Sequence, residues 1–176
     1  MALVIETGAG LPNSEAYADA SAFSAWETAY YGDASAGDAA SKEAAIRRAV
    51  AYLDDLTWKG TRTNGRSQAL AWPRSGVTDC EDVAISSNVI PSEVIYAQHV
   101  LARAELMSPG VLSPSVSLGA VVKRNKVDVI EQELDTSRLH GNADELRPIV
   151  TMAMDRLSCL LAIKPGGQRI PWAVVV

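Results

Sequence analysis

Apolar residues recur every three or four positions in four segments of the chain, and this spacing predicts a helix in each. The first helix is expected over 19–31, with Asp19 or Ser21 as its N-cap and Gly32 at its end. The second opens at Ser41 and carries the clearest amphipathic stripe, formed by Ala45, Ile46, Ala49, Val50 and Leu53. Its charged residues, which we expect on the solvated side without a chemical role, are Arg47, Arg48, Asp54 and Asp55.

Two further helices are expected in the second half of the chain. Pro91 suits the first turn of a helix that should stop near Met107, where prolines make continuation costly. A last helix is expected over 143–163, with Asn142 as its cap and the Pro-Gly-Gly at 165–167 as its terminator. The positions predicted to face inward on these two helices are Val94, Ala97, Leu101, Ala104, Ile149, Met152, Ala153, Leu157, Leu160 and Leu161.

The helical pattern is interrupted in several places. Residues 1–13 indicate an extended arm followed by a turn-rich tether, and 120–134 alternates apolar and charged residues, which makes a short hairpin or arm plausible. The predicted fold is therefore mainly α, a small bundle of about four helices. It has a long ordered loop, a segment that could form a short β hairpin, and extended N- and C-terminal arms. We expect one helical domain over 1–164, with its N-terminal arm, and a C-terminal docking tail over 165–176.

The long loop is the segment 58–77, which contains two tryptophans, Trp58 and Trp72, and no acidic residue. Its cations are Lys59, Arg62, Arg66 and Arg74, and its turns are set by Gly60, Gly65, Pro73 and Gly76. The whole chain has 16 Lys and Arg against 21 Asp and Glu, a formal charge of -5, so this cluster is a local exception. We expect it to meet something anionic or a neighbouring subunit.

Two uses of the loop remain open from the residues alone. Tryptophan faces and guanidinium groups suit the stacking of single-stranded bases, each worth roughly 1–3 kcal/mol. Tryptophan and arginine are also enriched at the centres of protein interfaces. The first part of the chain has no cation before Lys42, and its acidic residues are Glu6, Glu15, Asp19, Glu27, Asp33 and Asp38. Such a polarised chain suits head-to-tail ring assembly. The loop from Lys59 to Arg74 would then contact an adjacent subunit or tail protein, with Trp72 and Arg74 the first residues to test.

The C-terminal segment, QRIPWAVVV, is unusually apolar for a chain end. Its apolar residues are Ile170, Pro171, Trp172, Val174, Val175 and Val176. Exposed residues of this kind favour aggregation, so we expect the tail either to pack on its own domain or to dock on another chain.

Composition excludes several classes of protein. A sequence pI near 5.0 argues against a protein that wraps a nucleic-acid backbone, and no apolar run approaches the roughly 20 residues needed to span a bilayer. Cys80 and Cys159 lie far apart in a chain without a secretory signal, so we predict a reducing compartment and a core position for Cys159.

No catalytic arrangement is visible. His99 is predicted to be a partly buried helix residue and His140 a turn residue, and neither stands in a catalytic motif. The acidic run 79–82 lacks the ligand spacing of a calcium or zinc site. We therefore expect no enzyme activity, no cofactor and no metal.

Four blocks carry a family resemblance: ALVIETGAGLPNSEAY at the N-terminus, AAIRRAVAYLDDLTWKG in the second helix, QALAWPRSGV in the loop and IPSEVIYAQHVLA in the third helix. In this order and spacing they resemble the head-to-tail connectors, or adaptors, of tailed bacteriophages over most of residues 2–107. The resemblance implies a structural virion protein in a ring of twelve copies, located in the neck between capsid and tail and in the host cytoplasm during assembly. It also implies that the C-terminal segment docks on the portal protein, that a stopper or tail terminator protein binds the other side, and that DNA passes through the lumen without specific binding.

The same residues equally resemble proteins labelled as DnaT-like and single-stranded DNA-binding. That label implies a DNA-binding accessory protein whose contacts would be Arg62, Arg66, Arg74 and the two tryptophans. The acidic balance of the chain favours the connector, with DNA binding as the alternative.

Overall fold

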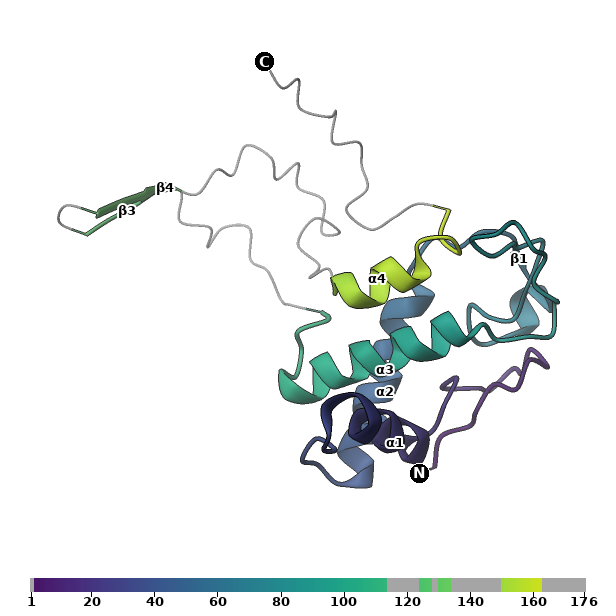
Figure 1. The fold of residues 1–176 in the computed structure, drawn as a ribbon, viewed down its shortest axis with the longest axis horizontal. Coiled ribbons are helices and arrows are strands. Elements are labelled where there is room, and N and C mark those ends of the chain that lie inside the picture. Colours follow the sequence, from purple (N-terminus) through teal and green to yellow (C-terminus); the bar gives the residue numbers. More distant parts are fainter. Residues whose placement is uncertain (1, 114–123, 128–129, 134–149, 163–176) are drawn as a thin grey trace, which may run out of the picture.

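The structure, a computed structural model, describes residues 2–113, 124–127, 130–133 and 150–162, and it is mainly helical, as predicted. Its helices are α1 (Ala20–Tyr31), α2 (Ala39–Asp54), α3 (Ser92–Met107) and α4 (Thr151–Leu157), with a short 3-10 turn, η1 (Gly65–Ser67). The strands are β1 (Thr61–Arg62), β2 (Arg74–Ser75), β3 (Arg124–Val127) and β4 (Ile130–Glu133). In Figure 1, α2 and α3 cross at the centre and the loop that holds β1 lies at one end of them.

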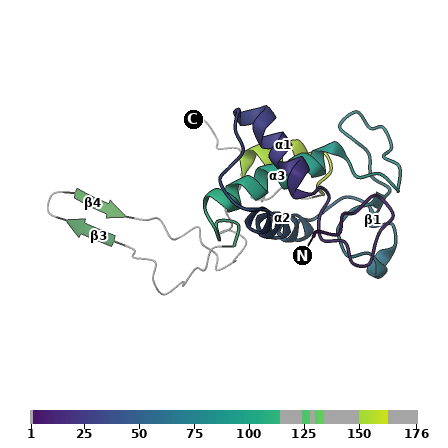
Figure 2. The ribbon, with the colours of Figure 1, turned by 90° about the horizontal axis from the view of Figure 1, so that it is seen from below.

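The core forms around α3. Helix α2 packs across it, α4 lies against it, and α1 contacts both α2 and α3. Seen from below in Figure 2, α1 and α2 lie on different sides of α3. The apolar stripe predicted for the second helix is buried in full at Ala45, Ile46, Ala49, Val50 and Leu53. On α3, Val94, Ala97 and Leu101 are buried as predicted, whereas Ala104 is only half-buried.

Side-chain caps set where the first two helices begin. The carboxylate of Asp19 accepts a 2.8 Å hydrogen bond from the backbone N–H of Ala22, as predicted, and Gly32 ends α1 with a φ of 80°. Helix α2 begins before the predicted Ser41, because Asp38 accepts a 2.8 Å hydrogen bond from the Ser41 N–H and serves as its cap.

The N-terminal arm is folded onto the domain. The buried Glu6 carboxylate accepts hydrogen bonds from the backbone N–H groups of Gly8, Gly10 and Leu11 at 2.7–2.9 Å. Gly8 has a φ of 99°, and a Cβ at this position would lie 1.9 Å from the carbonyl oxygen of Asn88. The segment predicted to be a tether is therefore a fixed part of the structure.

The last helix is shorter at its C-terminal end than predicted. Helix α4 ends at Leu157, whereas the pattern continued to 163, and the predicted positions 143–149 lie outside the described residues. After α4 the chain turns to pair with the residues that follow α2: Lys59 N–H donates to the Leu160 carbonyl at 3.0 Å, and Ala162 N–H donates to the Thr57 carbonyl at 2.9 Å. This pairing replaces further helical turns.

Of the inward positions predicted on this last helix, Ala153, Leu157, Leu160 and Leu161 are buried. Met152 is 48% exposed, so the prediction was wrong for this residue. Within 120–134, where a short hairpin or an arm was expected, the structure shows β3 and β4 paired in antiparallel register, with Arg124 opposite Glu133.

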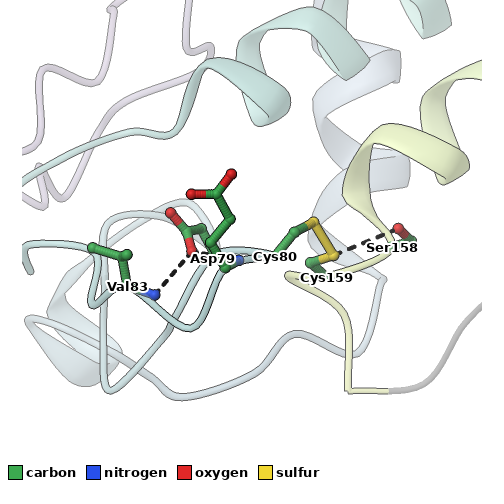
Figure 3. Close-up of a disulfide and its surroundings, with 6 residues drawn as sticks. Asp79, Cys80, Val83, Ser158 and Cys159 are labelled. Atoms are coloured by element: carbon green, nitrogen blue, oxygen red, sulfur yellow. Dashed lines mark hydrogen bonds between the residues drawn. A yellow bond between two sulfur atoms is a disulfide. The ribbon is translucent and has the colours of Figure 1, made fainter.

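A disulfide joins Cys80 to Cys159 across 79 positions of sequence. Figure 3 shows the bond between the loop that follows β2 and the turn that follows α4. The core position predicted for Cys159 was wrong: Cys159 is half-buried and bonded to Cys80. The disulfide could not be predicted from the sequence, because only the packing of α4 brings these two cysteines together.

Candidate functional site

The basic segment 58–77 is an ordered loop, as predicted. Strands β1 and β2 pair across it in antiparallel register, with Arg62 opposite Arg74, and η1 forms its tip. It is tied to the N-terminal arm, because the Asn64 side chain donates to the carbonyl of Ala9 at 2.8 Å and Ala69 N–H donates to the carbonyl of Leu11 at 2.9 Å. The loop is thus part of the folded domain.

Both tryptophans of this loop belong to the core. Trp72 is 0% exposed and Trp58 is 7% exposed, and their rings meet edge to face with centroids 5.7 Å apart. The indole N–H of Trp58 donates to the carbonyl of Leu53 at 2.9 Å. Neither ring is available for stacking on a base or for a partner, so the surface role predicted for Trp72 does not fit the structure.

Arg74 also turns inward. Its Nε donates to the carbonyl of Lys59 at 2.7 Å, and its two terminal nitrogens donate to the carbonyls of Ala71 at 3.1 Å and Gly60 at 2.6 Å. Desolvation lowers the pKa of Arg74, and neighbouring Arg62 adds to the effect. All three guanidinium nitrogens hold the loop's own backbone, so Arg74 shapes this loop.

Three of the four predicted cations remain at the surface. Lys59 and Arg66 are exposed, and Arg62 is half-buried beside Arg74. The apolar C-terminal positions predicted to bind a partner, Ile170, Pro171, Trp172, Val174, Val175 and Val176, lie outside the described residues, as does His140. His99 is buried, close to the partly buried position predicted for it.

A polar network beneath the loop involves Asp54, to which the sequence assigned no role. The Asp54 carboxylate accepts a 2.7 Å hydrogen bond from the Ala71 N–H and a 3.4 Å bond from the Tyr17 hydroxyl. The same hydroxyl oxygen accepts from the Trp72 N–H at 3.2 Å. Burial raises the pKa of Asp54 to about 6 and that of Tyr17 well above its usual value. This network fixes the loop to α2 through Asp54 and to the segment before α1 through Tyr17.

A second surface, which the sequence did not indicate, is a row of aromatic rings between α1 and α3. The Trp26 ring centroid lies 5.1 Å from that of Tyr30, 5.7 Å from that of Tyr31 and 5.7 Å from that of Tyr96. The centroids of Tyr30 and Tyr96 are 5.6 Å apart. These four rings form one continuous cluster that reaches the surface, where Tyr30 is 57% and Tyr31 is 46% exposed.

An arginine lies at each end of this cluster. The guanidinium carbon of Arg103, on α3, is 3.9 Å from the centroid of Tyr31, and that of Arg156, on α4, is 4.8 Å from the centroid of Tyr96. We call the four rings and these two arginines the arginine-capped aromatic row. The sequence placed Trp26 and Tyr30 only within the first predicted helix, 19–31, and nothing linked them to residues 96 and 156.

Among the residues that the structure describes, no group of histidine, cysteine, aspartate and glutamate side chains could hold a metal ion. Nor is any helix in the described ranges long and apolar enough to cross a membrane. Asp79 instead uses its carboxylate to accept from the N–H groups of Glu81 and Val83 at 2.8 and 2.9 Å, within its own turn.

The chain belongs to a protein family described as "Putative DnaT-like ssDNA binding protein", whose sequence model matches residues 1–173. No curated protein and no solved structure matches the chain.

Proposed function

We propose that this protein binds single-stranded DNA. The observation that carries the proposal is membership, over residues 1–173, of a family described by that activity. The surface cations Lys59, Arg62 and Arg66 support it, because one ordered loop presents them together and no acidic residue interrupts them. The chain as a whole has a net charge of -5, so this patch is a local basic exception in an acidic protein.

The test is a titration of a fluorescent oligothymidine at several salt concentrations. Each phosphate contact on a single strand contributes about 0.7 to the slope of log affinity against log salt. The double substitution Arg62→Ala and Arg66→Ala should therefore weaken binding and flatten that slope. Arg47→Ala, which removes a cation of α2 that pairs with Glu15, is the matched control and should change binding little. Absence of binding by the unmodified protein near 0.15 M salt would refute the proposal.

A second candidate is a non-catalytic head-to-tail connector of a tailed bacteriophage. It is supported by the connector resemblance, whose sequence blocks meet in one folded unit, although the single-stranded DNA-binding label shares the same blocks. Tyr17 N–H donates to the Gln98 side chain at 2.7 Å, joining the N-terminal block to the block of the third helix. Trp72 N–H donates to the Tyr17 hydroxyl at 3.2 Å, joining the loop block to the N-terminal block. The acidic balance also suits a ring through which DNA passes without adhering, because like charges repel.

In this candidate function the protein would form a ring of twelve copies in the virion neck, bound to the portal on one side and to a stopper or tail terminator on the other. Electron microscopy of the protein mixed with portal rings tests it. A stoichiometric ring complex that is lost when residues 170–176 are deleted would support the connector and the predicted docking tail. A portal ring that binds no copies would exclude this candidate.

A further inference from the structure

The strongest unassigned feature of the surface is the arginine-capped aromatic row. Large apolar side chains gather there, since Tyr30, Tyr31 and Met152 are all at least 46% exposed. The Tyr96 hydroxyl lies 3.2 Å from the Met152 sulfur, which joins the exposed methionine of α4 to the rings. An exposed apolar surface rimmed by polar groups marks a site of interaction.

We propose that this row is where the bases of a single strand stack, with a phosphate held by Arg156. The proposal rests on the proposed function and names the part of the DNA that the row takes. Tyr30 is the main platform, because it is the most exposed of the rings and Trp26 supports it from the core side at 5.1 Å. A stacked base contributes roughly 1–3 kcal/mol, and every base has a face that can stack.

The two arginines favour a nucleic acid over a purely apolar partner. The charge of Arg103 is balanced by the buried Glu27 carboxylate, 2.7 Å away, so this arginine mainly holds Tyr31 in place. Arg156 is exposed and lies over the Tyr96 ring, so its outward donors suit a phosphate next to a stacked base. Rings and a cation together match the two chemical parts of a nucleotide.

Because the chain is acidic overall, base contacts such as those of this row matter for its affinity for a single strand. A protein of net charge -5 gains little from phosphates beyond its local cations, so much of its affinity for a single strand must come from base contacts. Trp58 and Trp72 are buried, and the exposed aromatic rings of the described residues are Tyr30 and Tyr31. Among the residues that the structure describes, stacking therefore falls to the row.

The test compares an oligothymidine with an abasic strand of the same length. Tyr30→Ala should weaken binding of the oligothymidine by about 5- to 150-fold, the equivalent of a stacked base, and leave binding of the abasic strand unchanged. Tyr30→Phe keeps the ring and should bind within about twofold of the unmodified protein. Val83→Ala, at a side chain 58% exposed on another loop, is the matched control and should have no effect.

A second measurement does not depend on the folding of any variant. The unmodified protein is cross-linked by ultraviolet light to an oligonucleotide that carries a halogenated uracil, and its peptides are mapped by mass. Adducts within 20–31 or at Tyr96 would support the row as the base site. Adducts confined to 58–77 would overturn it and leave the proposed function standing.

The remaining outcomes also separate the two proposals. If the unmodified protein binds no single strand, both fail. If it binds and Tyr30→Ala binds equally well, only the row fails. If Tyr30→Ala instead dissociates an oligomer in sedimentation while DNA binding is unchanged, the row is an interface between copies of the chain, and the stacking proposal is overturned.

Discussion

The carboxylate of Glu27 on α1 accepts a 2.7 Å hydrogen bond from the guanidinium of Arg103 on α3. Glu27 is completely buried, and it also accepts from the backbone and hydroxyl of Ser35 and lies 3.9 Å from the ammonium of Lys42. The same guanidinium lies over the Tyr31 ring. One buried ion pair thus fixes α1 on α3 and orients one end of the arginine-capped aromatic row.

Glu27→Gln should therefore lower the free energy of unfolding by about 3–5 kcal/mol, because it leaves the charges of Arg103 and Lys42 without their counter-ion. Urea denaturation measures the loss. Glu43→Gln breaks a more exposed pair with Arg47 at 3.7 Å and should cost less than about 1 kcal/mol. Equal losses in the two variants would contradict the structural role given to Glu27.

Gly8→Ala should destabilise the N-terminal arm. The new methyl group would lie 1.9 Å from the Asn88 carbonyl oxygen, and the φ of 99° is unfavourable for any other residue. Gly65 also has a positive φ, 57°, but a Cβ there meets nothing within 4 Å, so Gly65→Ala isolates the backbone strain, about 1–2 kcal/mol. Thermal melts should rank Gly8→Ala as clearly the less stable, and the reverse order would show that the arm is not docked as described.

His99 should make the protein less stable in mild acid. Burial beside the Phe23 and Trp26 rings lowers the pKa of His99 to about 4, although Asp19 and Glu27 oppose the shift. Because its pKa is lower in the folded state than in the unfolded state, the stabilisation is present above pH 6.5 and is lost as pH falls toward 4. We expect His99→Gln to remove a pH dependence of about 2–3 kcal/mol from this window. Urea denaturation at half-unit pH steps tests this, and an unchanged slope would contradict it.

Asp54 should act in the opposite direction. Its pKa is raised to about 6, so its neutral form favours the folded state, and this stabilisation is present below pH 3.8 and lost as pH rises through 6. Asp54→Asn keeps an acceptor for the Ala71 N–H and removes the titration. The variant should therefore lose stability more steeply than the unmodified protein as pH falls from 6 to 4, because His99 then acts unopposed. A shallower slope would be inconsistent with a buried Asp54.

Reduction of the Cys80–Cys159 disulfide should lower stability by about 2–4 kcal/mol, because the bond closes a loop of 79 positions in the unfolded chain. Thermal melts with and without a thiol reductant measure the shift. The double substitution Cys80→Ser and Cys159→Ser should match the reduced protein and respond no further to reductant. A melting temperature that does not depend on reductant in the unmodified protein would show that the bond does not form in solution.

Local sequence patterns predicted the helix bounds well where residues at the helix ends set those bounds. The bounds of α1 follow from Asp19 and Gly32, and α3 occupies the segment between Pro91 and the prolines after Met107. For α4 the apolar period continued past the real end, because pairing of the chain with residues 57–59 stops the helix. Periodicity shows which side chains are apolar, and it carries no information on a distant segment that pairs with the same backbone groups.

The candidate sites also depend partly on local sequence and partly on tertiary contacts. Sequence alone determined the mainly helical fold, the ordered basic loop and the family resemblance, because these depend on residues close together in the chain. Only the tertiary structure decided that Trp72 is core, that Arg74 holds its own loop and that Cys80 meets Cys159. It also assembled the aromatic row from three helices. Exposure and contact depend on how helices pack, and two tryptophans in a basic loop have the same sequence pattern whether their rings face solvent or the interior.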